Sequence, residues 1–448
     1  MTNEQSYIDL YTEASDIIKQ HGASLLNKAR DEAFERFQQL GFPTSELEDY
    51  RYCKLAQELS VNYGMNLKRL QFLLNPRDLF MCDVPGIKSA LFFIINDQLS
   101  VDKHLVQQES LPEGVIMCSL VEACQKHADL VAQYLGHQIK ECSDGFVAFN
   151  ETFAQDGYFL YVPKDIILES PIQLINILRA DVDLLTVSRN LIILEPGAQV
   201  KILVCDHAMD SINFFTDRLT EIFVGENAIF DYYSLENTHS KTNNISQIFV
   251  NQEANSKSIF NTIGLNSGRT RNHVEIDLNG QGAETWLGGM LVSDEQQQSE
   301  NFTVIRHNVP QCTTTELYKY ILDGEAEGAF SGRIIVKPGA QKTIANQTNR
   351  NICLTKTAKM YSKPQLEIYA DDVKCGHGAT TGQLDENALF YMRTRGLSGQ
   401  EARMLLLSAF TSDVLNQISV EPLRDRLRLM VEKRLRHDET KCNGCLIC

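Results

Sequence analysis

The chain of 448 residues carries 42 basic and 58 acidic side chains, which give a formal net charge of −16 and a pI near 5.1. This acidic balance argues against a general nucleic-acid binder, because such a protein presents a basic face. The run of apolar residues at 91–95 has the length of a strand, and no run approaches the roughly 18 residues that a membrane-spanning helix needs. We therefore expect neither a nucleic-acid nor a membrane partner.

Twelve cysteines are scattered along the chain, and the N-terminus is polar and acidic, unlike a signal peptide. The cysteines are therefore expected to be reduced thiols, and the protein is expected to be cytoplasmic. At roughly 100–200 residues per domain, the length suggests two or three domains with ample core.

Residues 1–145 are expected to form an N-terminal region of helices and mixed structure. Apolar side chains at helical spacing indicate helices within residues 1–60, interrupted at 41–43 by Gly-Phe-Pro. A further helical piece is predicted at 119–138, among short apolar runs. We expect this region to brace the rest of the molecule.

Between residues 146 and 383, short β-branched runs alternate with turns. Two runs, at 191–199 and 334–341, share the pattern Ile-Ile-x-x-Pro-Gly-Ala-Gln, which is typical of a strand followed by a tight turn in which glycine supplies the backbone freedom. One such unit cannot bury both of its faces, so the units must stack. The pattern favours a β-helix or a β-sandwich, and it does not separate the two.

Residues 384–437 are predicted to be helical. Asp385 is expected to cap one helix, Ser398 and Glu401 form a capping-box pattern before a second, and Pro422 opens a third. The apolar stripe of the second helix consists of Ala402, Leu405, Leu406, Ala409, Phe410, Val414 and Ile418. The third helix is strongly basic. These helices form either an ordinary packing stripe with a solvated basic face or a docking surface for a partner.

Cys375 and His377 stand two residues apart in a glycine-rich run at 371–382. If they lie on a strand, the period of two directs both side chains to the same face. A sulfur and an imidazole together can hold iron, copper or zinc. Two ligands do not close a metal site, so further donors must come from a partner or a ligand.

This run, with Leu389–Gly396 after it, resembles the end of the SufB/SufD family of the SUF iron–sulfur assembly machinery. The lysine-cysteine-x-histidine-glycine-alanine-threonine pattern at 374–380 is closer to the SufD branch. Glu46–Tyr52 resembles a second family signature, with Tyr50 where tryptophan is expected. The resemblance implies a mainly β fold with helical ends: a right-handed parallel β-helix at 146–383, flanked by the N-terminal region and by C-terminal helices.

The resemblance also implies a non-catalytic scaffold subunit with two kinds of partner. A SufB-like subunit is expected to pair with it through the β-helix, and a SufC-like ATPase to dock on Leu405, Leu406 and Phe410; alone, the chain is expected to be able to form a homodimer. His377 and, with less support, Cys375 are expected to ligate a nascent iron–sulfur cluster at the subunit interface. This cluster is transient and shared with the partner, so no tightly bound cofactor is expected in the isolated chain.

The last eleven residues, 438–448, contain Cys442, Cys445 and Cys448 in Cys-x-x-Cys-x-x-Cys spacing. Neighbouring thiolates at this spacing can wrap one metal or one cluster. A bacterial cluster-binding run continues to a fourth cysteine, so the tail is either an incomplete site or a reduced tail without metal. An independent metal-binding or redox protein that uses this tail is therefore one alternative function.

A carbohydrate-active β-helix enzyme is the second alternative. The acidic clusters at 293–295 and 371–372 could suggest glycosidase carboxylates, but nothing in the sequence sets a separation between two of them, and solvated turns explain them better. Other histidines and cysteines in the strand-rich region are expected to be structural: His207, His239, His273, His307, Cys205, Cys312 and Cys353.

The tail lends itself to a direct test. A tetrahedral metal would need a fourth ligand, which His437 is near enough in sequence to supply, but ordering the tail costs roughly 1–2 kcal/mol per residue. Deleting residues 440–448 should therefore leave complex assembly and cluster delivery nearly unchanged, as measured by co-purification and by cluster transfer to an apo-acceptor. Loss of cluster assembly in a complex that still forms would identify the tail as a working site.

Overall fold

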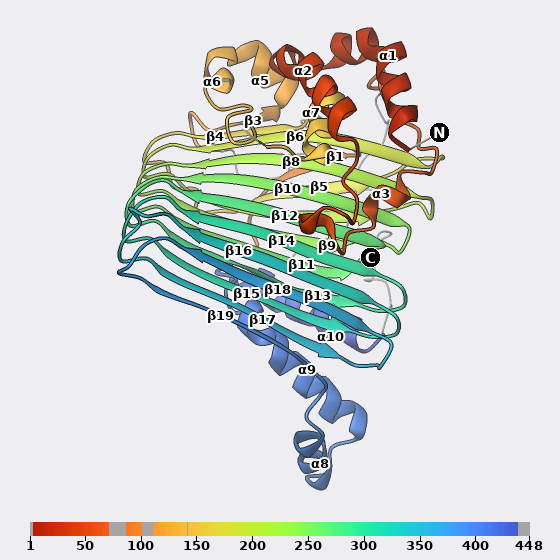
Figure 1. Cartoon of the computed structure of the whole chain (residues 1–448), viewed down its shortest axis with the longest axis vertical. Helices are drawn as coiled ribbons and strands as arrows, with labels where there is room; N and C mark the ends of the chain where they lie inside the picture. The colour runs from red at the N-terminus through yellow and green to blue at the C-terminus, as the bar shows by residue number, and fades with distance from the viewer. Residues whose placement is uncertain (1–2, 71–86, 101–110, 141, 438–448) are drawn as a thin grey trace.

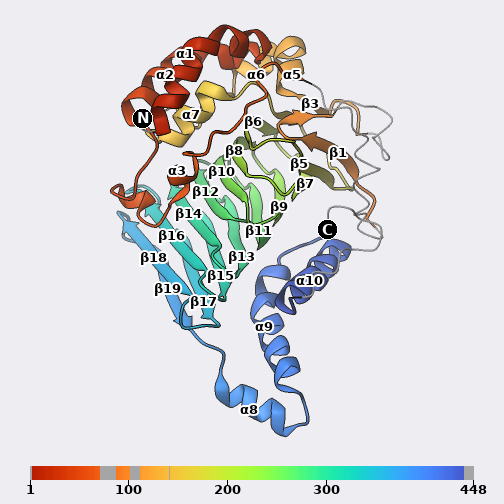
Figure 2. The ribbon, with the colours of Figure 1, turned by 90° about the vertical axis from the view of Figure 1, so that its right-hand side faces the viewer.

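The computed structural model describes residues 3–70, 87–100, 111–140 and 142–437. Two long sheets face each other along most of the molecule, and helices lie at one end and along one side (Figures 1 and 2). Sheet A has the strand order β18-β16-β14-β12-β10-β8-β6-β4-β3, and sheet B has the order β19-β17-β15-β13-β11-β9-β7-β5-β1-β2. From β4 onward consecutive strands alternate between the sheets, so each turn of the chain adds one strand to each sheet.

The strands of sheet A are β3 (Ile116–Ser119), β4 (Tyr158–Val162), β6 (Leu184–Leu194), β8 (Phe214–Val224), β10 (Thr242–Gln252), β12 (Arg269–Leu278), β14 (Gln298–His307), β16 (Glu327–Val336) and β18 (Lys359–Ile368). Those of sheet B are β1 (Ala90–Ile95), β2 (Gln98–Leu99), β5 (Ile172–Leu178), β7 (Gln199–Ala208), β9 (Ile229–Asn237), β11 (Lys257–Asn266), β13 (Glu284–Ser293), β15 (Thr313–Leu322), β17 (Ile344–Cys353) and β19 (Lys374–Gly382). Neighbouring strands in both sheets pair in parallel, except for the antiparallel pairs β1–β2 and β3–β4. The parallel β-helix is therefore confirmed over the β-sandwich.

Tight turns between the sheets recur once per coil on one side of the helix. Gly197 (φ +74°) and Gly282 (φ +77°) adopt the left-handed conformation that glycine tolerates, and Asn227 (φ +58°) adopts it at an equivalent turn. The prediction for the two Pro-Gly-Ala-Gln motifs is thus correct at Gly197. It is wrong at the second motif, where Lys342 (φ +60°), and not the motif glycine, takes the left-handed conformation.

The space between the sheets holds the main hydrophobic core. Inward-facing side chains such as Ile192, Val224, Leu291 and Ile334 are almost completely buried there. Each strand contributes alternate residues to this core, because successive side chains of a strand point to opposite faces. The outward-facing residues of both sheets remain to be covered by other elements.

Helices of the N-terminal region cover the outer face of the first strands of sheet A (Figure 2). They are α1 (Asn3–His21), α2 (Ser24–Leu40), the short 3-10 helix η1 (Glu48–Tyr50), α3 (Leu55–Glu58), α5 (Leu120–Lys126), α6 (Ala128–Ala132) and α7 (Gly145–Phe153). Phe37, Phe149 and Phe153 meet outward-facing strand residues such as Phe159 in one buried cluster. This packing closes the first end of the β-helix.

Two details of the N-terminal region differ from the sequence-based expectation. The single helical piece predicted at 119–138 is wrong, because two short helices, α5 and α6, meet at His127. The first residues assigned to the strand-rich region form α7 instead, which is buried on nearly every side. A helix without a polar face shows no 3.6-residue periodicity, so its sequence resembles a buried strand.

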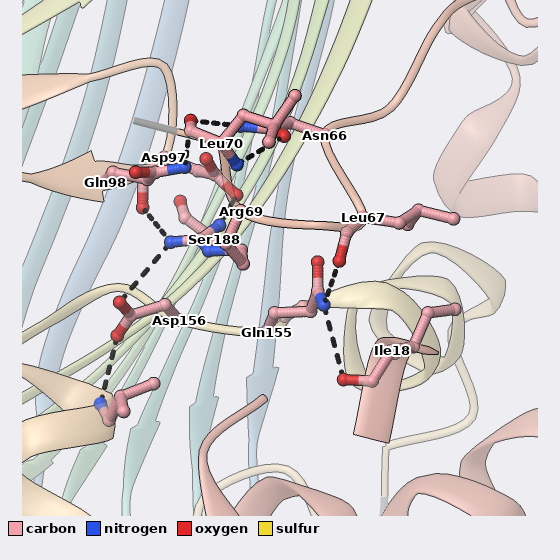
Figure 3. A network of polar contacts seen from close by, with 12 residues as sticks. Ile18, Asn66, Leu67, Arg69, Leu70, Asp97, Gln98, Gln155, Asp156 and Ser188 are labelled. Carbon is pink, nitrogen blue, oxygen red and sulfur yellow. Dashed lines mark hydrogen bonds and ion pairs between the residues drawn. The ribbon is translucent and has the colours of Figure 1, made fainter. Parts of the chain in front are cut away.

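Buried polar contacts join the N-terminal region to the β-helix (Figure 3). Gln155 Nε2 donates to the carbonyl oxygens of Leu67 (2.9 Å) and Ile18 (3.3 Å). The next residue, Asp156, accepts from the guanidinium of Arg69 at 3.3 Å. Both Gln155 and Asp156 are buried, so these contacts fix α1 and the segment after α3 against the start of sheet A.

A second connection runs the length of sheet A. The segment around η1 crosses the outer face of the sheet, with Asp49 paired to Arg333 of β16 (3.0 Å) and Lys54 to Glu327 of the same strand (2.7 Å). The ring of Tyr52 stacks on Tyr361 of β18 with 4.4 Å between the ring centroids. Residues near the second family signature thus reach the last strand of sheet A.

The C-terminal helices are α8 (Glu386–Thr394), α9 (Gly399–Leu415) and α10 (Glu421–Leu435). The predicted caps are confirmed: Asp385 caps α8, and Ser398 and Glu401 form the capping box of α9. Helices α9 and α10 pack on the outer face of sheet B, whereas α8 projects away from it (Figure 2). None of the helices in the described part of the chain has the length and apolarity that a membrane span requires.

Glu316, inside the β-helix, provides a test of this buried interior. Burial raises the pKa of Glu316 to about 7, although hydrogen bonds from Thr303 and Gln347 oppose the rise. The folded state therefore holds the Glu316 proton more tightly than the unfolded state does. The contribution of protonated Glu316 to the free energy of unfolding is complete at acidic pH and is lost as the pH rises through about 7. Glu316→Gln should gain on the order of 2 kcal/mol over wild type between pH 5 and pH 8.5, measured by urea denaturation. A stability difference that does not change with pH would contradict the ionisation of Glu316 in this range.

Candidate functional site

The candidate site lies on β19, the last strand of sheet B. One edge of β19 pairs in parallel with β17, and the other has no partner among the described strands. In this pairing Cys375 lies opposite Ala345, and His377 lies opposite Gln347. The sequence-predicted pair is therefore on a strand and at the terminal edge of the β-helix.

Cys375 and His377 share the inward-facing side of β19. Ala345, the register partner of Cys375, is fully buried in the core between the sheets, and the Cys375 side chain packs partly against the same core. His377 follows two residues later, so its side chain leaves the strand on this same face, and it is exposed because no further coil covers it. The predicted common face is confirmed.

The protein environment does not activate the Cys375 thiol. Partial burial raises the pKa of Cys375 above its ordinary value, and a backbone hydrogen bond from Ala345 only partly opposes this. The thiol is therefore protonated at neutral pH until a metal ion or a base displaces the proton. If Cys375 acts as a ligand, its thiol would lose a proton when it binds the metal.

Within the residues that the structure describes, no group of three or more His, Cys, Asp and Glu side chains is arranged to hold a metal ion. Cys375 and His377 thus remain a pair. A tetrahedral iron or zinc needs about four ligands. The geometry permits a shared site, completed by donors that approach the open end of the β-helix.

The predicted docking residues on α9 differ in exposure. Leu405 is 51% exposed, Leu406 is partly exposed, and Phe410 packs partly against the outer face of sheet B. The Phe410 ring lies 4.8 Å from Lys319 Nζ, which also donates to the Phe410 carbonyl oxygen at 2.6 Å. Phe410 therefore has a structural contact in addition to its exposed part.

The packing stripe predicted for α9 is partly wrong. Leu405 and Ala409 are exposed, while the buried face also contains Met404, Leu407 and Leu415. The helix carries apolar residues around most of its circumference, so periodicity could not select the face that meets sheet B. Leu405, which was expected in the packing stripe, is therefore available at the surface.

The structure adds exposed apolar residues on α8 that the sequence interpretation did not name as docking residues. Helix α8 has no buried residue, and Phe390 and Tyr391 are 69% and 58% exposed. We call these two residues together with Leu405 the arm surface. Large apolar side chains that are exposed on neighbouring helices can contribute to an interaction site. The sequence contains these residues within a family motif, but only the structure shows that nothing in the described chain covers them.

The structure also places the other histidines, cysteines and acidic residues considered in the sequence. Hydrogen bonds engage His239, His273 and His307, and Cys205, Cys312 and His207 are buried while Cys353 is partly buried. Asp294, from one of the acidic clusters, accepts two hydrogen bonds from Arg434 of α10 at 2.6 and 2.7 Å. The tail cysteines Cys442, Cys445 and Cys448 lie outside the described residues.

The structure is a parallel β-helix with a sulfur–imidazole pair on its terminal edge strand, followed in the chain by a helix without buried residues. Comparison with known families identifies the class of protein. The family model described as "SUF system FeS cluster assembly, SufBD core domain" matches residues 177–410, and that of the SufBD N-terminal region matches residues 1–174. The chain belongs to the SufBD family of the SUF iron–sulfur cluster assembly system, which confirms the resemblance inferred from the sequence.

Individual relatives support the SufD branch. The chain is 29% identical to the iron–sulfur cluster assembly protein SufD of Escherichia coli, over 54% of this chain and 57% of that protein. It is 26% identical to SufD of Bacillus subtilis, over 74% of this chain and 77% of the relative. An iron–sulfur cluster assembly SufBD family protein of Synechocystis is 30% identical over 74% of this chain and 75% of its own length.

Proposed function

We propose that the chain is a SufD-like, non-catalytic subunit that forms, with a SufB-like partner and a SufC-like ATPase, a scaffold for iron–sulfur cluster assembly and transfer. The observation that carries this proposal is the incomplete pair of Cys375 and His377 on the open edge of β19. Family membership provides the chemical context, because the family model describes iron–sulfur cluster assembly. Iron and sulfide are the cargo of such a site.

The open end of the β-helix suits a SufB-like partner. Both β18 and β19 have one edge without a partner among the described strands, so the backbone N–H and C=O groups of two sheets are available at the same end. A second β-helix can add strands to both edges and cover them. Such a partner would bring further ligands, a cysteine and a carboxylate, toward His377. A second copy of this chain could use the same edges when no partner is present.

The arm surface suits the SufC-like ATPase. Its exposed side chains, Phe390, Tyr391 and Leu405, lie on α8 and α9, just after the end of β19 in the chain. A movement of a docked ATPase would therefore reach the strand that carries His377 through a short connection. We place this assembly in the cytoplasm, where thiols remain reduced.

The role of His377 can be tested by His377→Ala. The fold and the complex should be unaffected, because the side chain is exposed on an edge strand between two glycines. Loss of one ligand should lower cluster formation in the reconstituted complex by well over tenfold, followed by absorbance and by iron and sulfide content. Cys375→Ser should have a milder effect.

His137→Ala, at an exposed histidine in the N-terminal region, is the matched control and should form clusters normally. A normal cluster yield in His377→Ala would remove the proposed site. A loss in both variants would indicate a general effect of losing an exposed histidine.

The arm surface can be tested by Leu405→Glu. This side chain is largely exposed, so the variant should fold normally but lose most of its binding to the ATPase in a pull-down. Phe410→Glu should in addition lower thermal stability, because Phe410 packs against sheet B and Lys319. Leu429→Glu places the same change at a comparably exposed leucine on α10 and should retain binding. Full ATPase binding by a folded Leu405→Glu variant would place the docking surface elsewhere.

A further inference from the structure

A row of buried amides lies directly beneath the candidate site. Gln347, Asn349 and Asn351 of β17 are 1%, 0% and 3% exposed. They alternate along the strand with residues of the opposite face, and all three point into the interior of the β-helix. Gln347 is the register partner of His377 on the neighbouring strand. The last coil therefore lies directly above a layer of buried polar side chains.

The Gln347 amide is held in place from below. Its Nε2 donates to Glu316 Oε2 of β15 at 2.6 Å, and Thr303 Oγ1 of β14 donates to the other oxygen of Glu316 at 2.5 Å. Both Glu316 and Thr303 are almost fully buried. The hydrogen-bonded series Thr303–Glu316–Gln347 therefore connects sheet A with the strand next to His377.

Gly332 of β16 makes room for this amide. A Cβ atom at position 332 would lie 2.3 Å from Gln347 Nε2, which is closer than atoms can approach without displacement. The glycine thus leaves a space that the Gln347 side chain fills from the opposite sheet. The amide therefore packs closely against the backbone of β16 at Gly332.

The amide oxygen of Gln347, in contrast, accepts no hydrogen bond from the described residues. Gln347 Oε1 is buried and has no hydrogen-bond partner in the part of the chain that the structure describes. A buried acceptor without a partner is unfavourable and uncommon in native proteins. Since Nε2 is engaged by Glu316, the free oxygen is turned away from that carboxylate. Neighbouring parallel strands are only about 4.8 Å apart, so the imidazole of His377 on β19 is within reach.

We propose that Gln347 is a positioning residue for His377, and that its Oε1 accepts a hydrogen bond from one imidazole N–H so that the other nitrogen faces the open end of the β-helix. This inference rests on the proposed function and names the group that orients its ligand. Histidines that bind metal commonly donate their second N–H to such a partner, which fixes the tautomer and the ring orientation. A neutral amide suits this task because it accepts the hydrogen bond without favouring the imidazolium, which cannot bind metal.

The orientation of His377 can be measured in the isolated full-length chain without any cluster. Histidine labelled with ¹³C at Cε1 gives one NMR signal per residue, and the His377 signal is identified by its absence in His377→Ala. At a single pH where the imidazole is neutral, this signal should be shifted from the free-histidine position and should report restricted ring motion. In Gln347→Met it should move toward the free-histidine position and sharpen.

Gln247→Met is the matched control. Gln247 of β10 is also fully buried, donates to a carboxylate (Asp217 Oδ1, 3.2 Å) and has an Oε1 without a partner among the described residues, but it lies far along sheet A from His377. The Gln247→Met variant should lower the free energy of unfolding by about as much as Gln347→Met and should leave the His377 signal unchanged. If Gln347→Met does not fold, Gln347→Asn withdraws the amide by one methylene group and should produce the same spectral change.

An unchanged His377 signal in a folded Gln347 variant would overturn the proposal. In the reconstituted complex, Gln347→Met should lower cluster formation by about tenfold, as for outer partners of metal-binding histidines, while complex assembly stays intact. If His377→Ala forms clusters normally, the proposed site fails, but the NMR comparison still decides whether Gln347 orients His377. The two failures are therefore distinguishable.

Discussion

The rest of this structure depends on how a stack of parallel strands ends. Each coil of the β-helix buries its inward face against the opposite sheet and satisfies its backbone groups through the coils before and after it. At the first end, the antiparallel strands β2 and β3 and the N-terminal helices complete this arrangement. At the other end, β18 and β19 are the last strands of their sheets, so the unsatisfied edge and the sulfur–imidazole pair occur at the same place. The unpaired strand edges and the incomplete ligand pair therefore both result from the β-helix ending at β18 and β19.

The interior near this end contains several buried polar side chains. Glu316, Gln347, Asn349 and Asn351 are buried in the coils just below β19 and form hydrogen bonds with one another or with neighbouring strands. Buried polar groups of this kind fix a single arrangement when all partners are present. An end coil without a successor has few other contacts to define its geometry, and Asn351 also holds it through a hydrogen bond to Thr381 Oγ1 at 3.2 Å. The polar layer thus connects the exposed strand to the coils below it.

Elements outside the two sheets connect this end with the rest of the molecule. On one side, the segment around η1 reaches β18 through the stacked rings of Tyr52 and Tyr361. On the other side, α9 packs on sheet B, and Lys319 joins its Asp413 carboxylate at 2.6 Å. Helix α8 lies between β19 and α9 in the chain and packs no residue into the core. A partner bound to α8 would therefore act on the end strand with little intervening structure.

Much of this protein can be predicted from its sequence, because the relevant signals are local. Repeated strand–turn patterns require stacking, the capping residues Asp385 and Ser398 define helix starts, and the spacing of Cys375 and His377 places them on one face of a strand. These features depend on backbone geometry over a few residues. Tertiary structure alone decided which face of α9 is buried, that α7 is a helix enclosed on nearly all sides, and that β19 is an edge. It also brought Glu316 and Gln347, 31 residues apart in the chain, into contact beneath His377. In a β-helix the neighbours of a residue lie one coil away in the sequence, and only the stacking of whole coils decides which residues these are.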